Sequence, residues 1–120
     1  MILVDTNAWV AHLRRSDARL VDFLTQQRVF TTDVVVGELL LGSGLPKDFA
    51  RLLSALPHVP TPRADETRAY SERHRRSLGG SGVGWADVQV LCAAFKAGAR
   101  IHTADRAVRK VCGALGLALA

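Results

Sequence analysis

The sequence predicts an α/β fold built on a short, mostly parallel sheet. Three observations indicate it. Short apolar segments alternate with longer amphipathic ones along the whole chain. The first segment, Ile2-Leu3-Val4, is apolar without a break, as is typical of a strand buried on both faces. Glycine or proline follows several of the longer segments, as is typical at the ends of helices. Helices that alternate with short strands indicate an α/β fold.

The end signals of each segment set the expected boundaries. Asn7 and Ser16 are the expected N-caps of the first two helices, and Thr61 with Pro62 is the expected start of a long one. Gly98 is expected to end the most apolar helix. The predicted helices cover 8–15, 17–27, 32–41, 48–56, 62–78, 85–97 and 106–112; the predicted strands cover 2–4, 29–31, 100–103, a brief one at Val59, and a closing edge of alternating Leu115, Leu117 and Leu119.

Size and composition indicate a single domain that spans residues 1–120. The chain has 120 residues, 48% of them hydrophobic, which is enough for a packed core. Cys92 and Cys112 show no metal-ligand spacing and are expected to be buried, reduced thiols. The N-terminus does not read as a signal peptide, and no apolar run approaches the roughly 20 residues of a membrane span. We therefore expect a soluble, cytoplasmic protein without a membrane partner.

Two acidic residues follow predicted strands. Asp5 comes directly after the first strand, and Asp105 comes just after Ile101-His102-Thr103. The carboxyl ends of parallel strands form the ligand crevice of open sheets, so these two carboxylates are expected to face it. The alternative is that each is an ordinary helix cap or turn residue.

Two further acids lie in apolar helices. Glu38 has Val34, Val35 and Leu41 at helical spacing, so its carboxylate is expected to be buried and to need a partner. The alternative is a partly exposed glutamate at a helix edge, or one that is paired with an arginine. Asp87 lies in the first turn of the very apolar helix that begins near Trp85, where the positive helix end stabilises an anion.

If these four acids converge, their mutual repulsion calls for a hard divalent cation. Ligands made only of oxygen favour Mg²⁺ or Mn²⁺. The four histidines show no ligand spacing among themselves or with the cysteines, so the sequence does not indicate zinc.

These acids and their surroundings resemble a PIN-domain ribonuclease. The resemblance is carried in order by Ile2-Leu3-Val4-Asp5-Thr6-Asn7, by Glu38, by Gly82-Val83-Gly84-Trp85-Ala86-Asp87 and by Ile101-His102-Thr103-Ala104-Asp105, over residues 1 to about 110. Within that family, the short chain is similar to VapC-type toxins of toxin–antitoxin pairs.

The resemblance implies a three-layer α/β/α sandwich and a site in which Asp5, Glu38, Asp87 and Asp105 bind Mg²⁺ or Mn²⁺. It implies RNA hydrolysis by a metal-activated water, a homodimer and inhibition by a cognate VapB-like antitoxin. Asn7 replaces a serine that is frequent in the family, and Asn7 and Thr103 are the expected supporting polar residues.

Basic residues are expected to guide the substrate, in keeping with a net charge of +5 and a pI of about 10.0. The candidates for RNA binding are Arg73, Arg75, Arg76 and Arg106. Trp9 and Trp85 could stack on RNA bases, but the simpler interpretation is that both are core residues. The leucine-rich helices between Val34 and Leu56 are expected to pack together or to receive an antitoxin or a second protomer.

Three other functions fit parts of this pattern. An aspartyl-phosphate phosphatase also places an aspartate after an apolar strand, but it requires a second one two residues on, where this chain has Asn7. A non-catalytic RNA-binding protein would be hindered by clustered carboxylates. A PIN-like nuclease of RNA processing, acting without an antitoxin, remains an alternative on the same residues.

Overall fold

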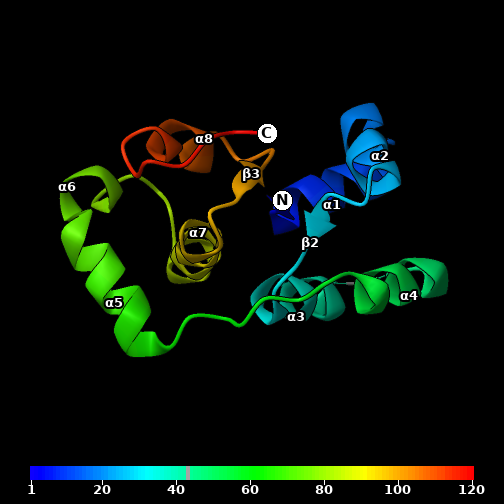
Figure 1. The fold of residues 1–120 in the computed structure, drawn as a ribbon, viewed down its shortest axis with the longest axis horizontal. Coiled ribbons are helices and arrows are strands. Elements are labelled where there is room, and N and C mark those ends of the chain that lie inside the picture. Colours follow the sequence, from blue (N-terminus) through cyan, green and yellow to red (C-terminus); the bar gives the residue numbers. More distant parts are fainter. Residues whose placement is uncertain (43) are drawn as a thin grey trace.

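A computed structural model describes residues 1–42 and 44–120 of the chain and shows an α/β fold in which helices flank a parallel sheet (Figure 1). The predicted fold class is thereby confirmed. The elements follow the order β1 (Ile2–Val4), α1 (Thr6–Arg14), α2 (Ala18–Thr25), β2 (Val29–Phe30), α3 (Asp33–Leu41), α4 (Lys47–Ala55), α5 (Ala64–Arg73), α6 (Arg75–Leu78), α7 (Trp85–Ala97), β3 (Arg100–His102) and α8 (Arg106–Cys112).

In the described residues the sheet has three strands in the order β2-β1-β3, all parallel. Leu3 of β1 pairs with Phe30 of β2 and Ile101 of β3, and all three side chains are fully buried. β1 is the central strand, which explains its unbroken apolar sequence. Because the strands are parallel, the chain leaves β1 and β3 at the same edge of the sheet, which we call the acidic edge because Asp5 and Asp105 follow there.

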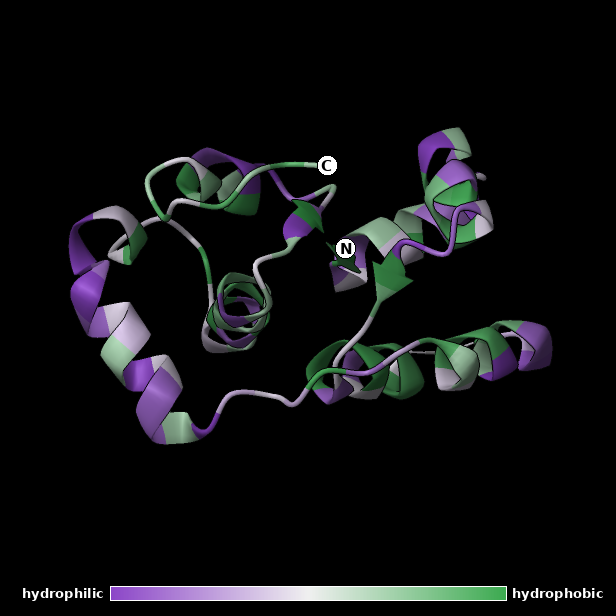
Figure 2. Cartoon of the chain, in the orientation of Figure 1, coloured by the Kyte–Doolittle hydropathy of each residue, from purple (hydrophilic) through white to green (hydrophobic). Residues whose placement is uncertain are grey.

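Helix α7 explains how so small a sheet acquires a core. It contacts β3, α5 and α3, and it buries a run of apolar residues that includes Val90, Leu91 and Ala94 (Figure 1). Figure 2 colours most of α5 as hydrophilic, as expected of an outer helix, and most of α3 as hydrophobic. Gly98 ends α7 in a left-handed conformation with φ of 63°, as the sequence predicts.

Several helix starts differ from the prediction. Asp5, rather than Asn7, caps α1, and Asp17, rather than Ser16, caps α2 by accepting hydrogen bonds from the amides of Arg19 and Leu20. Asp, Asn and Ser are comparably good caps, so sequence alone does not decide between neighbours. The long helix expected from Pro62 begins instead at Ala64 and is interrupted at His74.

The predicted outer strands shrink to single bridges. Thr31 pairs with His58 rather than with a strand at Val59, and Leu119 alone pairs with Ile101. Leu115 is buried in a turn and Leu117 in an irregular segment, and neither forms part of a closing strand. Their alternation therefore reflects packing against the core and not a strand period.

The two cysteines are free and buried, as predicted. Burial raises the pKa of both thiols. Among the described residues, no helix combines the length and the apolar character that crossing a membrane requires.

Candidate active site

Asp5 lies at the centre of the acidic edge. It follows β1, caps α1 and is only 3% exposed. Its Oδ1 accepts a hydrogen bond from the Thr6 amide at 2.8 Å, and its Oδ2 accepts one from the Thr103 hydroxyl at 2.9 Å. Burial raises the pKa of Asp5 to about 6 even though these two hydrogen bonds lower it.

Asp105 reaches the same edge from β3. It caps α8 by accepting a hydrogen bond from the Val108 amide at 3.1 Å. The Thr103 hydroxyl that donates to Asp5 also accepts a hydrogen bond from the Asp105 amide at 3.1 Å, so one side chain positions both acids. Asn7 donates to Asp105 Oδ2 at 3.1 Å and thus links α1 to α8.

Asp87 comes to this edge on α7. It lies in the first turn of that helix, is half-buried, and accepts a hydrogen bond from the Gly84 amide at 3.0 Å. The negative charges of Asp87 and Asp105 both raise the pKa of Asp5 further. Three acids that are far apart in the sequence therefore act on one another electrostatically.

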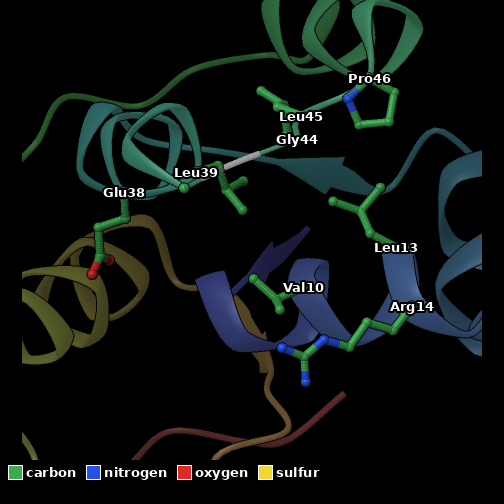
Figure 3. A pocket seen from close by; sticks show the side chains of 9 residues that line it. Val10, Leu13, Arg14, Glu38, Leu39, Gly44, Leu45 and Pro46 are labelled. Atoms are coloured by element: carbon green, nitrogen blue, oxygen red, sulfur yellow. The ribbon is translucent and has the colours of Figure 1, made fainter.

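Glu38 differs from its predicted setting. The side chain is exposed, and Figure 3 shows it reaching from α3 toward α7. Its Oε1 accepts a hydrogen bond from the Thr6 hydroxyl at 2.8 Å. The expectation of a buried carboxylate is wrong because α3 is apolar around most of its circumference, and several of its apolar residues, such as Leu40 and Leu41, face solvent.

Hydrogen bonds thus connect Glu38 through Thr6 to Asp5, and Asp5 through Thr103 to Asp105. Sequence reasoning missed Thr6, although a hydroxyl directly after the strand-end acid is a usable signal. Each oxygen of Asp5 accepts one hydrogen bond here and retains a further lone pair.

The chemistry of these donors fits a hard divalent cation. Buried and surrounded by like charge, the Asp5 carboxylate is destabilised as an anion, and all four side chains offer only oxygen. Within residues 1–42 and 44–120, no three acidic, histidine or cysteine side chains are arranged closely enough to hold a metal ion. Each acid accepts a hydrogen bond from a nearby amide or hydroxyl instead.

The candidate RNA-binding residues are all exposed and lie on α5, α6 and α8. Arg75 pairs with Glu72 at 3.4 Å, whereas the structure records no ion pair for Arg73, Arg76 or Arg106 among the residues that it describes. Trp9 is fully buried in the core, and Trp85 is half exposed at the start of α7. Trp85 thus remains available to a ligand, and Trp9 does not.

Comparisons with known proteins find relatives that match nearly the whole chain. The family model "PIN domain" matches residues 2–114. Ribonuclease VapC32 of Mycobacterium tuberculosis is 39% identical over 122 aligned positions, which cover 100% of this chain and 97% of that protein.

Solved structures of low identity share the fold. DNA-bound VapBC from Salmonella typhimurium has a TM-score of 0.73 at 18% identity, covering 99% of this chain and 96% of that chain. FitAcB from Neisseria gonorrhoeae has a TM-score of 0.66 at 20% identity, with the same two coverages. With a family model that matches nearly its whole length, the chain belongs to the PIN domain family.

Proposed function

We propose that this chain is a metal-dependent ribonuclease of the VapC type, the toxin of a toxin–antitoxin pair. The observation that carries the proposal is the buried strand-end carboxylate of Asp5, with Asp87 and Asp105 close enough to raise its pKa. The full-length similarity to a protein named Ribonuclease VapC32 supports RNA as the substrate.

In this proposal, Asp5, Asp87 and Asp105 hold Mg²⁺ or Mn²⁺, and Glu38 is either a fourth ligand or orients water. When bound, such an ion supplies positive charge that makes water a better nucleophile and offsets charge on the phosphate. Thr103 fixes Asp5 and Asp105 relative to each other, and Asn7 restrains Asp105. Water attacks rather than the ribose 2′-hydroxyl, and the bond from phosphorus to the 3′ oxygen breaks, so the products carry a 5′-phosphate and a 3′-hydroxyl.

Matched amide substitutions test the proposal. Asp5→Asn and Asp87→Asn each remove one ligand charge with little change in shape, so each should lower RNA cleavage in Mg²⁺ or Mn²⁺ by at least about a hundredfold, in line with lost metal-site electrostatics. Asp48→Asn on α4, where the acid is exposed, is the control and should cleave normally. Wild-type cleavage by either site variant would refute the mechanism. Metal-independent RNA binding without cleavage by the wild-type protein would favour a non-catalytic RNA-binding protein.

We also propose an antitoxin as the partner, because two structures that share the fold are named as VapBC complexes. A pocket of about 390 Å³ between α1 and α3–α4 is a suitable receptor (Figure 3). Its lining is apolar at Val10, Leu13 and Leu39 and charged at Arg14 and Glu38. Leu13→Glu should weaken inhibition by a protein encoded beside this gene, while cleavage by the isolated chain stays unchanged.

A homodimer is the oligomeric state we propose. Leu40 and Leu41 leave apolar surface on α3, with exposures of 60% and 89%. Light scattering on the purified protein tests this, since a monomer across the micromolar range would contradict it.

A further inference from the structure

A hollow on the surface lies between α8 and the glycine-rich loop 79–84. Its volume is about 430 Å³, and it is lined by Ser81 from the loop and by Arg106, Ala107, Arg109 and Lys110 from α8. We call it the α8 hollow. It contains three cationic side chains and no acidic one.

The three cations crowd one side of a short helix. Arg106, Arg109 and Lys110 are spaced at three and four residues, so they are neighbours on the helix surface, where like charges repel. In the described part of the chain, none of them forms an ion pair, whereas Arg63 and Arg75 each pair with a nearby acid. An anion in the hollow would relieve this repulsion.

The α8 hollow is connected to the acidic edge through backbone and side chains. Arg106 directly follows Asp105, the cap of α8. Arg109 donates from Nη1 to the carbonyl oxygen of Thr103 at 3.5 Å, and the hydroxyl of Thr103 donates to Asp5. An anion held here therefore lies close to Asp105, at the α8 end of the acidic edge.

The loop wall of the hollow is shaped before any ligand arrives. The Ser81 hydroxyl donates to the carbonyl of Leu78 at 2.6 Å and accepts from the amide of Val83 at 3.1 Å. Gly82 has φ of 86°, and a Cβ placed there would lie 3.9 Å from that of Ala107, so the loop packs directly against α8. The same loop ends at Gly84, whose amide donates to Asp87.

We propose that the α8 hollow binds a backbone phosphate of the RNA substrate adjacent to the one that is cut. The inference rests on the proposed ribonuclease function and assigns it a substrate contact. Carboxylates at the acidic edge repel the RNA backbone, so cations beside them must hold it. Two guanidinium groups and an ammonium suit a phosphate, because guanidinium donates to phosphate oxygens in a bidentate manner. Such a contact gives affinity and register, without choosing a sequence.

Binding is tested in the Asp87→Asn background, in EDTA, so that the RNA stays intact. Fluorescence anisotropy of a labelled single-stranded RNA is measured over a range of KCl concentrations. Arg109→Ala/Lys110→Ala should raise Kd by about tenfold or more, as for lost charge-assisted hydrogen bonds. It should also reduce the slope of log K against log salt by about 1.4, or about 0.7 for each contact on a single strand.

Arg15→Ala/Arg51→Ala removes the same charge from exposed positions at the end of α1 and on α4, outside the α8 hollow, and is the matched control. It should change Kd less than threefold. Arg106→Ala/Lys110→Ala keeps the Arg109–Thr103 contact, and it should weaken binding in the same way. Thermal unfolding should show all variants folded, because removing crowded like charges does not destabilise α8.

Equal effects of the hollow and control variants would overturn the proposal, since net charge alone would explain them. Unchanged Kd and salt slope in both hollow variants would overturn it as well. In the Asp87-intact enzyme, Arg109→Ala/Lys110→Ala should raise KM with little change in kcat. If the wild-type enzyme cuts no RNA, the proposed ribonuclease function fails, and the anisotropy data still decide whether the hollow binds the backbone.

Discussion

Asp5 is the residue in which folding and function conflict most directly. Its carboxylate is buried at the end of β1, and the charges of two other acids act on it. The pKa rises from 3.8 to about 6. At neutral pH, the Asp5 side chain of the folded protein is therefore an anion in an environment that favours its protonated form.

The sign of this effect on stability follows from proton binding. Between pH 3.8 and about 6 the unfolded chain has released the Asp5 proton while the folded chain retains it, so stability falls as pH rises through this window. A shift of this size corresponds to about 3 kcal/mol at pH 7. We predict that, in EDTA at pH 7, Asp5→Asn has a free energy of unfolding about 1 to 3 kcal/mol higher than that of the wild type. The variant should therefore unfold at a higher urea concentration.

Urea titrations at pH 7 and pH 4 measure this difference. The advantage of Asp5→Asn should shrink toward pH 4, where the wild-type carboxyl is protonated in the folded state. A variant that is less stable than the wild type at pH 7 would show that the two hydrogen bonds to Asp5 outweigh its burial.

Thr103 is predicted to matter through its hydroxyl alone. That group donates to Asp5 and accepts from the Asp105 amide, and the residue is 4% exposed. Thr103→Val leaves the Asp105 amide without this acceptor, which should destabilise the fold by about 1 to 3 kcal/mol. It should also lower kcat, because two acids lose their common support. Thr103→Ser keeps the hydroxyl and should retain most activity; equal losses in both variants would show that the hydroxyl alone does not account for the role of Thr103.

At the scale of elements, the strand ends carry the site. β1 and β3 are adjacent and parallel, so Asp5 and Asp105 meet although 100 positions separate them. The apolar character of β1 and α7, read from the sequence, predicted both as buried elements, and the strand ends predicted a shared crevice for Asp5 and Asp105. The convergence of Asp87 and Glu38 with these two acids was implied by the family resemblance and not by the apolar pattern. The order of the strands and the hydrogen bonds between residues of the acidic edge depend on tertiary packing, which a single sequence does not reveal.

Other element-scale features escaped prediction for identifiable reasons. Glu38 lies in a helix so apolar that periodicity does not distinguish its buried face from its exposed one. His102 bonds to Asp17 at 2.8 Å and so attaches α2 to β3, a contact between residues 85 positions apart that no local pattern indicates. The interruption at His74 falls within a run of good helix formers.

Two glycines in helical settings allow a paired prediction. Gly37 lies inside α3, and an added Cβ would meet nothing within 4 Å, so Gly37→Ala should stabilise the fold by about 0.5 to 1 kcal/mol. Gly98 has φ of 63° at the end of α7, where alanine is strained, so Gly98→Ala should destabilise by about 1 to 2 kcal/mol. Thermal unfolding of both variants measures the difference. A stabilising effect of Gly98→Ala would contradict this account of the α7 end, and a destabilising effect of Gly37→Ala would contradict the account of α3.

At the scale of the whole molecule, carboxylates and arginines are distributed differently. The acidic edge gathers carboxylates from β1, α3, α7 and the end of β3, while exposed arginines are spread over several helices, including α4, α5, α6 and α8. A net charge of +5 attracts an RNA backbone, and the acids then require a cation before the phosphate can approach them. Substrate binding and metal binding are therefore expected to reinforce each other.

This arrangement predicts that the metal stabilises the entire fold. Asp5, Asp87 and Asp105 belong to segments at the two ends of the chain, so one cation held by all three joins these segments and binds only the folded state. At a metal concentration one hundred times Kd, linkage adds about 2.7 kcal/mol to the free energy of unfolding. Mg²⁺ or Mn²⁺ should raise Tm in the wild type, and EDTA should reverse the rise.

Differential scanning fluorimetry at constant ionic strength measures this shift without relying on activity. Asp48→Asn should shift like the wild type, whereas Asp5→Asn and Asp87→Asn should start from their own Tm and respond several-fold less to metal. An equal response in all four proteins would place the cation elsewhere on the molecule. A wild-type Tm that is indifferent to millimolar Mg²⁺ and Mn²⁺ would mean that the acids do not act as one site in the free protein, and that RNA must be present before a cation is held.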